Sequence, residues 1–333
     1  MLIKHRIPAP TRADGARSEN GYLLATFEIK LDASGNLESY RTLQPGQTGS
    51  NVWYAYLETN RGSSWFNGGT YVDSLSENAM AKFIEITHEI YKFRIGDKFG
   101  TTVPCIFTDE PQFTTKKQLS NPRAQEDIYM PWTTDLAKTF KNAYSSDLIA
   151  HIPELFWNLA DWTPSLTRYR YHDHVTERFV SAFMDQLSNW CRSNNLMLDG
   201  HMMEEPGLWS QTTAIGEAMR CYRNMDMPGM DLLADRVEFN TAKQVSSVGR
   251  QNGLKGAMTE IYGATHWTFG FEAHKGCGDW QAALGMTFRV QHLTWVSMAG
   301  ESKRDYPASI GYQSPWYKEY TLIEDHFAVL QSP

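Results

Sequence analysis

Residues 103–111 read VPCIFTDEP. The apolar run from Val103 to Phe107 has the length and character of a strand that is buried on both faces, and Pro111 ends it. Two adjacent acids, Asp109 and Glu110, stand at its carboxyl end, where packing gives no reason for a pair of charges. The stretch therefore predicts a buried strand whose tip carries functional side chains.

The same order of helix, apolar strand and polar tip recurs along the chain. The sequence predicts helices near 76–98, 175–193, 210–224, 240–251 and 278–284, and parallel strands near 52, 103, 196, 231, 256 and 286. In the first helix, apolar residues recur at three- and four-residue steps: Ala79, Phe83, Ile86, Ile90 and Phe93. The last four strands start about 25 to 35 residues apart, the length of a βαβ unit. This alternation predicts an α/β fold with a parallel sheet.

Polar residues end most of these strands, and in (β/α)8 barrels the active site lies at the carboxyl ends of the strands. An open doubly wound sheet is less favoured, because the chain has no glycine-rich phosphate loop. The sequence predicts six parallel strands, whereas a closed barrel has eight. We therefore expect a (β/α)8 TIM-type barrel that is incomplete at its N-terminus, with two strands before residue 1 and NVWYAYLET (51–59) as the third.

We expect residues 1–333 to form a single, partial barrel domain. Residues 1–20 are charged and interrupted by proline, which predicts an irregular N-terminal segment. Residues 24–57 hold short β-rich runs separated by turn residues, which predict a small antiparallel β excursion.

Composition narrows the possible partners. A net charge of -7 without a basic block argues against a nucleic-acid partner, and no apolar run reaches the length of a membrane span. The N-terminus lacks the apolar core of a signal peptide, so the localisation stays open, as does the oligomeric state. The 11 tryptophans suit a carbohydrate ligand, since aromatic faces stack on sugar rings.

Glycoside hydrolysis requires two carboxylates, one to protonate the leaving oxygen and one to attack or to activate water. Glu110 and Glu260 each end a predicted strand. We predict Glu110 as the general acid/base and Glu260 as the nucleophile or base, with no metal ligands and no cofactor. Predicted substrate-binding residues are Asp109, His201, Glu205, Trp267, His292, Lys303 and Asp305.

Four stretches carry a resemblance to a known family: 70–111 (TYVDSLSENAMAKFIEITHEIYKFRIGDKFGTTVPCIFTDEP), 200–206 (GHMMEEP), 259–263 (TEIYG) and 297–320 (SMAGESKRDYPASIGYQSPWYKEY). They resemble large glycoside hydrolases of the α-L-rhamnosidase group (family 106), and the placement of the two acids is similar to that in the β-galactosidase-type barrel clan. The resemblance implies a catalytic barrel that precedes accessory β-sandwich modules, absent from this chain, in proteins that are often secreted. It leaves the sugar, and retention or inversion, undecided. The α-L-rhamnosidase group also implies a calcium ion.

Two other readings stay open. A barrel fragment without the first strands is expected to bind carbohydrate without turning it over. Alternatively, Asp109, Glu110, His201 and Glu205 surround one ion in a metal-assisted hydrolase.

Overall fold

The computed structural model describes residues 2–4, 14–301 and 306–331. The chain forms two compact units, and each contains several separate segments. Unit 1 comprises residues 1–85, 112–183 and 212–216, and unit 2 comprises residues 86–111, 184–211 and 217–333. The expectation of one domain over 1–333 stays a prediction, because two compact units can belong to one domain.

Unit 1 contains an antiparallel sheet in the order β3-β2-β4-β1-β6. Its strands are β1 (Leu2–Lys4), β2 (Tyr22–Leu31), β3 (Leu37–Thr42), β4 (Val52–Leu57) and β6 (Ile128–Tyr129). The predicted antiparallel excursion is present, but β1 pairs with β4 and β6 where an irregular segment is expected. The remainder of that predicted irregular segment lies partly outside the described residues.

The prediction of 51–59 as a parallel barrel strand is wrong. Strand β4 pairs antiparallel with β2 and with β1, so it belongs to the sheet of unit 1. Its alternating burial is the pattern of a strand in an antiparallel sheet with two different faces, and Trp53 and Ala55 point inward. The described parallel strands number five instead of six.

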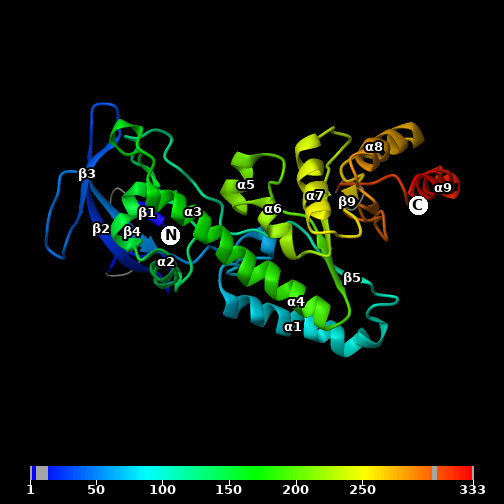
Figure 1. Cartoon of the computed structure of the whole chain (residues 1–333), viewed down its shortest axis with the longest axis horizontal. Coiled ribbons are helices and arrows are strands. Elements are labelled where there is room, and N and C mark those ends of the chain that lie inside the picture. The colour runs from blue at the N-terminus through cyan, green and yellow to red at the C-terminus, as the bar shows by residue number, and fades with distance from the viewer. Residues whose placement is uncertain (1, 5–13, 302–305, 332–333) are drawn as a thin grey trace. The chain divides into compact units, whose positions relative to one another are not determined.

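Unit 2 contains these five parallel strands in the order β10-β9-β8-β7-β5 (Figure 1). They are β5 (Cys105–Thr108), β7 (Met197–Gly200), β8 (Met227–Asp231), β9 (Met258–Ile261) and β10 (Phe288–Gln291). Each pairs with the next along the chain, which is the order that a (β/α)8 barrel uses. The sheet curls as part of such a barrel does, and the described residues contain five of the eight parallel strands that a closed barrel has.

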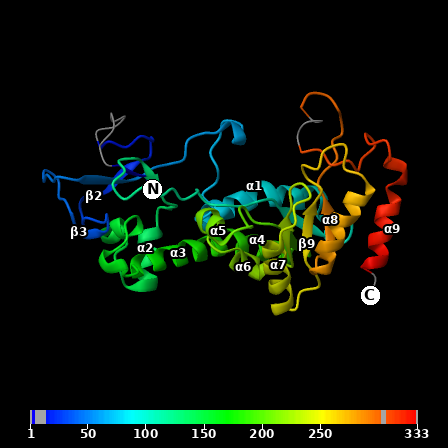
Figure 2. The same cartoon turned by 90° about the horizontal axis from the view of Figure 1, so that it is seen from above.

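Helices precede, connect and follow the parallel strands. They are α1 (Glu77–Ile95), α2 (Leu136–Tyr144), α3 (Leu166–Phe179), α4 (Gln186–Ser193), α5 (Leu208–Ala214), α6 (Ala218–Cys221), α7 (Phe239–Gln251), α8 (Phe271–Ala283) and α9 (Thr321–Leu330). A π-helical segment (Val180–Asp185) joins α3 to α4, and short 3-10 turns lie at Ser64–Phe66, Gly96–Lys98, Ile149–Leu155, Ala160–Trp162, Tyr222–Asn224 and Tyr317–Glu319. Helices α7 and α8 flank β9 in both views (Figures 1 and 2).

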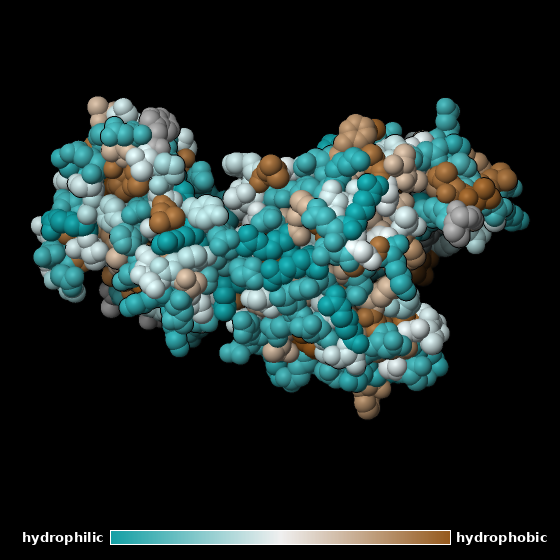
Figure 3. All heavy atoms as spheres, in the orientation of Figure 1, coloured by the Kyte–Doolittle hydropathy of each residue, from teal (hydrophilic) through white to brown (hydrophobic). Residues whose placement is uncertain are grey.

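Polar side chains cover most of one face of the molecule. On the face drawn in Figure 3, hydrophilic side chains predominate, and hydrophobic ones gather near the end that holds α9. Leu322, Val329 and Leu330 of α9 are exposed. No helix in the described ranges has both the length and the apolar character needed to cross a membrane.

Candidate active site

The candidate site lies at the carboxyl ends of the parallel strands of unit 2. Asp109 and Glu110 follow β5, His201 follows β7, Asp231 ends β8, and Glu260 is the third residue of β9. Because the strands are parallel and in consecutive order, their carboxyl ends lie along one edge of the sheet. Segments that are far apart in the sequence therefore contribute side chains to one place.

His201 is the centre of this group. Its side chain is 1% exposed, and its Nε2 lies 2.8 Å from Glu260 Oε2 and 3.4 Å from Asp109 Oδ1. Burial opposes a charge on the ring, but the hydrogen bond that His201 donates to Glu260 and the charges of Glu205, Asp231 and Glu260 outweigh it and raise the pKa of His201 to about 9. A buried imidazolium at neutral pH follows, and it donates a charge-assisted hydrogen bond to Glu260.

The backbone at Gly200 allows this position for His201. Gly200 has a φ of 125°, and a Cβ added there would lie 2.0 Å from the carbonyl oxygen of Thr108. The close approach of β7 to β5 therefore requires glycine at this residue. The backbone N–H of His201 donates to the same Thr108 oxygen at 3.2 Å, and this hydrogen bond holds the backbone of His201 in place.

Glu110 occupies a strained conformation. Its φ is 47°, a left-handed value that is uncommon for a residue with a side chain and that is concentrated at functional sites. Glu110 is half-buried, and burial is the main cause that raises the pKa of its carboxyl group; His201 opposes this shift, and the nearby acids Asp109, Glu260 and Glu204 add to it. A carboxyl group with a raised pKa is the form that a general acid needs.

Both acids of the IFTDEP stretch are near His201, although alternation along a regular strand would point one of them away. Strand β5 ends at Thr108, before either acid, and the left-handed turn at Glu110 breaks the alternation. Asp109 is 74% exposed at its side chain while still 3.4 Å from the His201 ring, whereas Glu110 is half-buried.

Glu205 is the most enclosed acid of the group. It is 3% exposed, its Oε1 accepts from the backbone N–H of Asp231 at 2.6 Å, and its Oε2 accepts from the Tyr222 hydroxyl at 2.8 Å and from the Met202 N–H at 3.2 Å. Burial, opposed by His201 and these hydrogen bonds, raises the pKa of Glu205 to about 7. Donors of the chain itself occupy both oxygens, so Glu205 holds the end of β8 in position.

Asp231 is not among the predicted site residues, because the predicted strand starts near 231, whereas β8 runs from Met227 to Asp231. Burial raises the pKa of Asp231 to about 7, with His201 opposing the shift and the neighbouring acids adding to it. Among the described residues, Asp231 Oδ1 and His201 Nδ1 are buried atoms without a hydrogen-bond partner. If the predicted strand began at 227 instead of near 231, Asp231 would stand at its carboxyl end.

The other predicted site residues are more dispersed. His292 follows β10, with its ring near Trp295 and Tyr306. Trp267 is half-buried in the loop after β9. Lys303 and Asp305 lie outside the described residues.

Two overlapping sets of possible metal ligands share His201. Asp109, His201 and Glu260 form one set, and Glu110, His201 and Asp231 form the other, with the ligand atoms of each set within 4.8 Å of one another. Calcium prefers oxygen ligands, and a protonated imidazole has no lone pair to offer. Each set offers two carboxylates and one imidazole, and a metal ion would have to displace the proton of His201 to use the ring nitrogen.

Comparison with known proteins gives a likeness of fold. No family model matches the chain, and no curated protein matches it. A solved structure, described as a rhamnosidase from Novosphingobium sp. PP1Y, superposes with a TM-score of 0.62 at 18% sequence identity over 85% of this chain. The matched region is 27% of that rhamnosidase, so the chain spans about a quarter of its length. At this identity the likeness concerns the fold.

Proposed function

We propose that the chain carries a glycoside hydrolase site in which Glu110 and Glu260 are the catalytic carboxyl groups. The observation that carries the proposal is that these acids, from the ends of two different strands, both lie beside the buried side chain of His201. The fold likeness to a rhamnosidase supports it. Rhamnosides are therefore the first substrates to test, and β-galactosides are the second.

In this proposal Glu110 donates its proton to the glycosidic oxygen as the bond from the anomeric carbon to that oxygen breaks. A raised pKa keeps a proton available on Glu110 at a pH where an ordinary glutamic acid has lost it. Glu260 then either attacks the anomeric carbon or takes a proton from an attacking water. The hydrogen bond from His201 orients the Glu260 carboxylate in both cases.

The proposal is tested with a panel of aryl glycosides and three variants. Glu110→Gln and Glu260→Gln remove one acid each and keep the side-chain shape. Glu272→Gln changes an exposed glutamate of α8 in the same unit and serves as the matched control. We expect the first two to lower kcat by about 10²-fold or more and the control to match the wild type. Wild-type rates in both site variants would end the assignment.

The stereochemical course separates the two roles of Glu260. Proton NMR of the first-formed sugar distinguishes a retained from an inverted anomer. Retention supports a covalent intermediate on Glu260, and inversion supports Glu260 as the base.

A metal-assisted hydrolase is the second candidate, because two sets of three ligand-type side chains meet at His201. A divalent ion there would act as a Lewis acid or activate water. Treatment with a chelator distinguishes the two-carboxylate hydrolase from the metal-assisted hydrolase. For the two-carboxylate hydrolase we expect unchanged activity. Loss of activity that a divalent ion restores would favour the second candidate. Sugar binding without any turnover would instead favour a carbohydrate-binding fragment.

A further inference from the structure

Unit 1 contains a cavity of about 400 Å³ that none of the residues of the carboxylate cluster lines. Its wall comes from residues 57–60, 70–75, 113–114 and 131–134, all within unit 1. This volume falls within the usual range of small-molecule sites. The cavity therefore has room for a ligand of its own.

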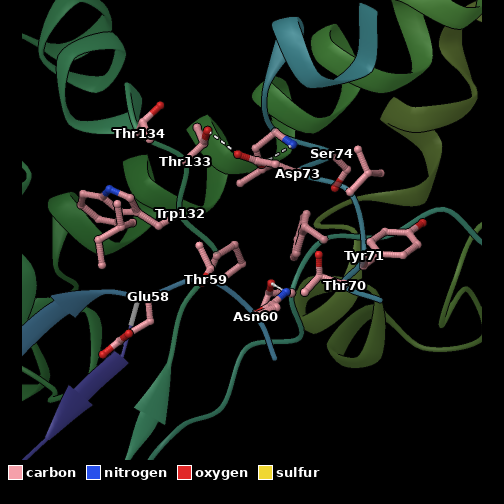
Figure 4. A pocket seen from close by; sticks show the side chains of 16 residues that line it. Glu58, Thr59, Asn60, Thr70, Tyr71, Asp73, Ser74, Trp132, Thr133 and Thr134 are labelled. Carbon is pink, nitrogen blue, oxygen red and sulfur yellow. Dashed lines mark hydrogen bonds between the residues drawn. The ribbon is translucent and has the colours of Figure 1, made fainter. Parts of the chain in front are cut away.

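Three aromatic side chains, Tyr71, Phe113 and Trp132, and many hydroxyl groups form the wall. Figure 4 shows Trp132 and Tyr71 on opposite sides of the pocket, with Thr133 and Asp73 along one edge and Thr59 and Asn60 along the other. Stacking rings combined with hydroxyl and amide groups are suited to the alternating apolar and polar faces of a sugar.

The charges in the wall do not favour an ionic ligand. No lysine or arginine is among the residues that line this cavity in the described part of unit 1. Asp73 Oδ2 accepts from the Thr133 hydroxyl at 2.7 Å, and its Oδ1 accepts from the Leu75 N–H at 3.1 Å. Glu58 likewise accepts from Arg17 N–H at 2.9 Å and from Ser18 N–H at 2.8 Å. Both acids are thus engaged within the protein.

Some polar groups in the wall remain available. Over the residues that the structure describes, neither the Trp132 indole N–H nor the Thr134 hydroxyl has a hydrogen-bond partner, and both side chains are at least partly exposed. A second cavity of about 550 Å³ adjoins the first, because both are lined by Glu58, Thr59, Asn60 and Thr114. Arg17 and Arg61 line this second cavity but not the first.

We propose that the cavity between Trp132 and Tyr71 is a binding site for a neutral saccharide, in addition to the carboxylate cluster of unit 2. The site contains no pair of unengaged acids, so its role is binding. It does not depend on hydrolysis in unit 2, and either proposal can fail without the other.

The test uses the full chain labelled with 5-fluorotryptophan and observed by fluorine NMR. The Trp132 resonance is assigned by its absence in Trp132→Phe, and Trp65, which is 81% exposed in unit 1 and does not line the cavity, is the control resonance. The probes are methyl α-L-rhamnopyranoside, methyl β-D-galactopyranoside and cellobiose, with inorganic phosphate as the anionic comparison. We expect a saturable shift of the Trp132 resonance with at least one neutral probe, and none at Trp65.

A second variant tests the polar side of the site. Thr134→Val removes a hydroxyl at the cavity and keeps the shape, and Thr115→Val changes an exposed threonine of unit 1 outside it. We expect affinity to fall about 3- to 10-fold in Thr134→Val and to stay unchanged in Thr115→Val. Unchanged fluorine resonances of the other tryptophans establish that the variants are folded. A Trp132 resonance that no neutral probe shifts, or that phosphate alone shifts, would overturn the proposal.

Discussion

Replacing His201 by glutamine removes the positive charge at the centre of the carboxylate cluster and keeps a side chain that can donate a hydrogen bond to Glu260. The pKa of His201 is raised from 6.5 to about 9, and the ring is buried. The difference of about 2.5 between these two values corresponds to about 3 kcal/mol that favours the imidazolium in the folded state. We expect His201→Gln to lose about this much stability at pH 7.

The sign of the pH dependence follows from the raised pKa. The stabilisation by the charged ring is fully present below pH 6.5 and is lost as the pH rises through about 9. The difference in stability between wild type and His201→Gln should therefore shrink between pH 7 and pH 10, mainly because the wild type becomes less stable.

Urea unfolding followed by tryptophan fluorescence, at a series of pH values from 6.5 to 10, measures this difference. His274→Gln is the matched control, since His274 is also fully buried in unit 2 and burial lowers its pKa, so it stays neutral throughout the range. Its destabilisation should not vary with pH across this window. Equal destabilisation of His201→Gln at pH 7 and pH 10 would show that packing, and not charge, explains its effect, and would refute the reasoning.

Three further outcomes are expected. Gly200→Ala should lower the free energy of unfolding by about 3 kcal/mol or more, because the added Cβ would lie 2.0 Å from the Thr108 oxygen. The effect is measured as a lower melting temperature. A melting temperature equal to that of the wild type would contradict the close approach of β7 to β5. Glu110→Gln should remove the high-pH limb of the kcat profile on alkyl glycosides, and an unchanged limb would assign the acid elsewhere. Cys105 is half-buried, and burial raises the pKa of its thiol to about 12. It should therefore react slowly with a disulfide reagent at pH 8, but faster than the three buried cysteines. Rapid labelling of Cys105 would argue against its burial.

The sequence pattern predicted much of unit 2. The parallel strands at 105, 197, 227, 258 and 288 begin within four residues of the predicted starts, because short apolar runs between helices are a local feature that can be read directly. Residues at the ends of β5, β7 and β9 were selected for the same reason. The catalytic and binding roles of these residues stay predictions.

Other features were not readable because they depend on contacts between distant segments. The helical pattern at 76–98 includes Ile86, Ile90 and Phe93 in the apolar stripe of the helix. In the structure Phe93 is 84% exposed, and the buried stripe consists of Met80, Ile84 and His88. Periodicity identifies a helix, but the face it buries depends on what packs against it. In the same way, the β-rich run at 52–57 is a strand, and only its partners assign it to the antiparallel sheet.

The sequence by itself determined an alternating α/β chain with acids at the tips of buried strands, since hydrophobic periodicity and polar strand ends are encoded locally. Only the tertiary structure decided that Asp109, Glu110, Asp231 and Glu260 surround one histidine, and that residues 57–60, 70–75 and 131–134 line a cavity in unit 1. The physical reason is that both arrangements depend on which strands and loops pair across long separations. Burial raises the pKa values of Glu110 and Asp231, and the surrounding acids raise the pKa of His201 against the effect of its burial. Both effects exist only once those distant segments have come together.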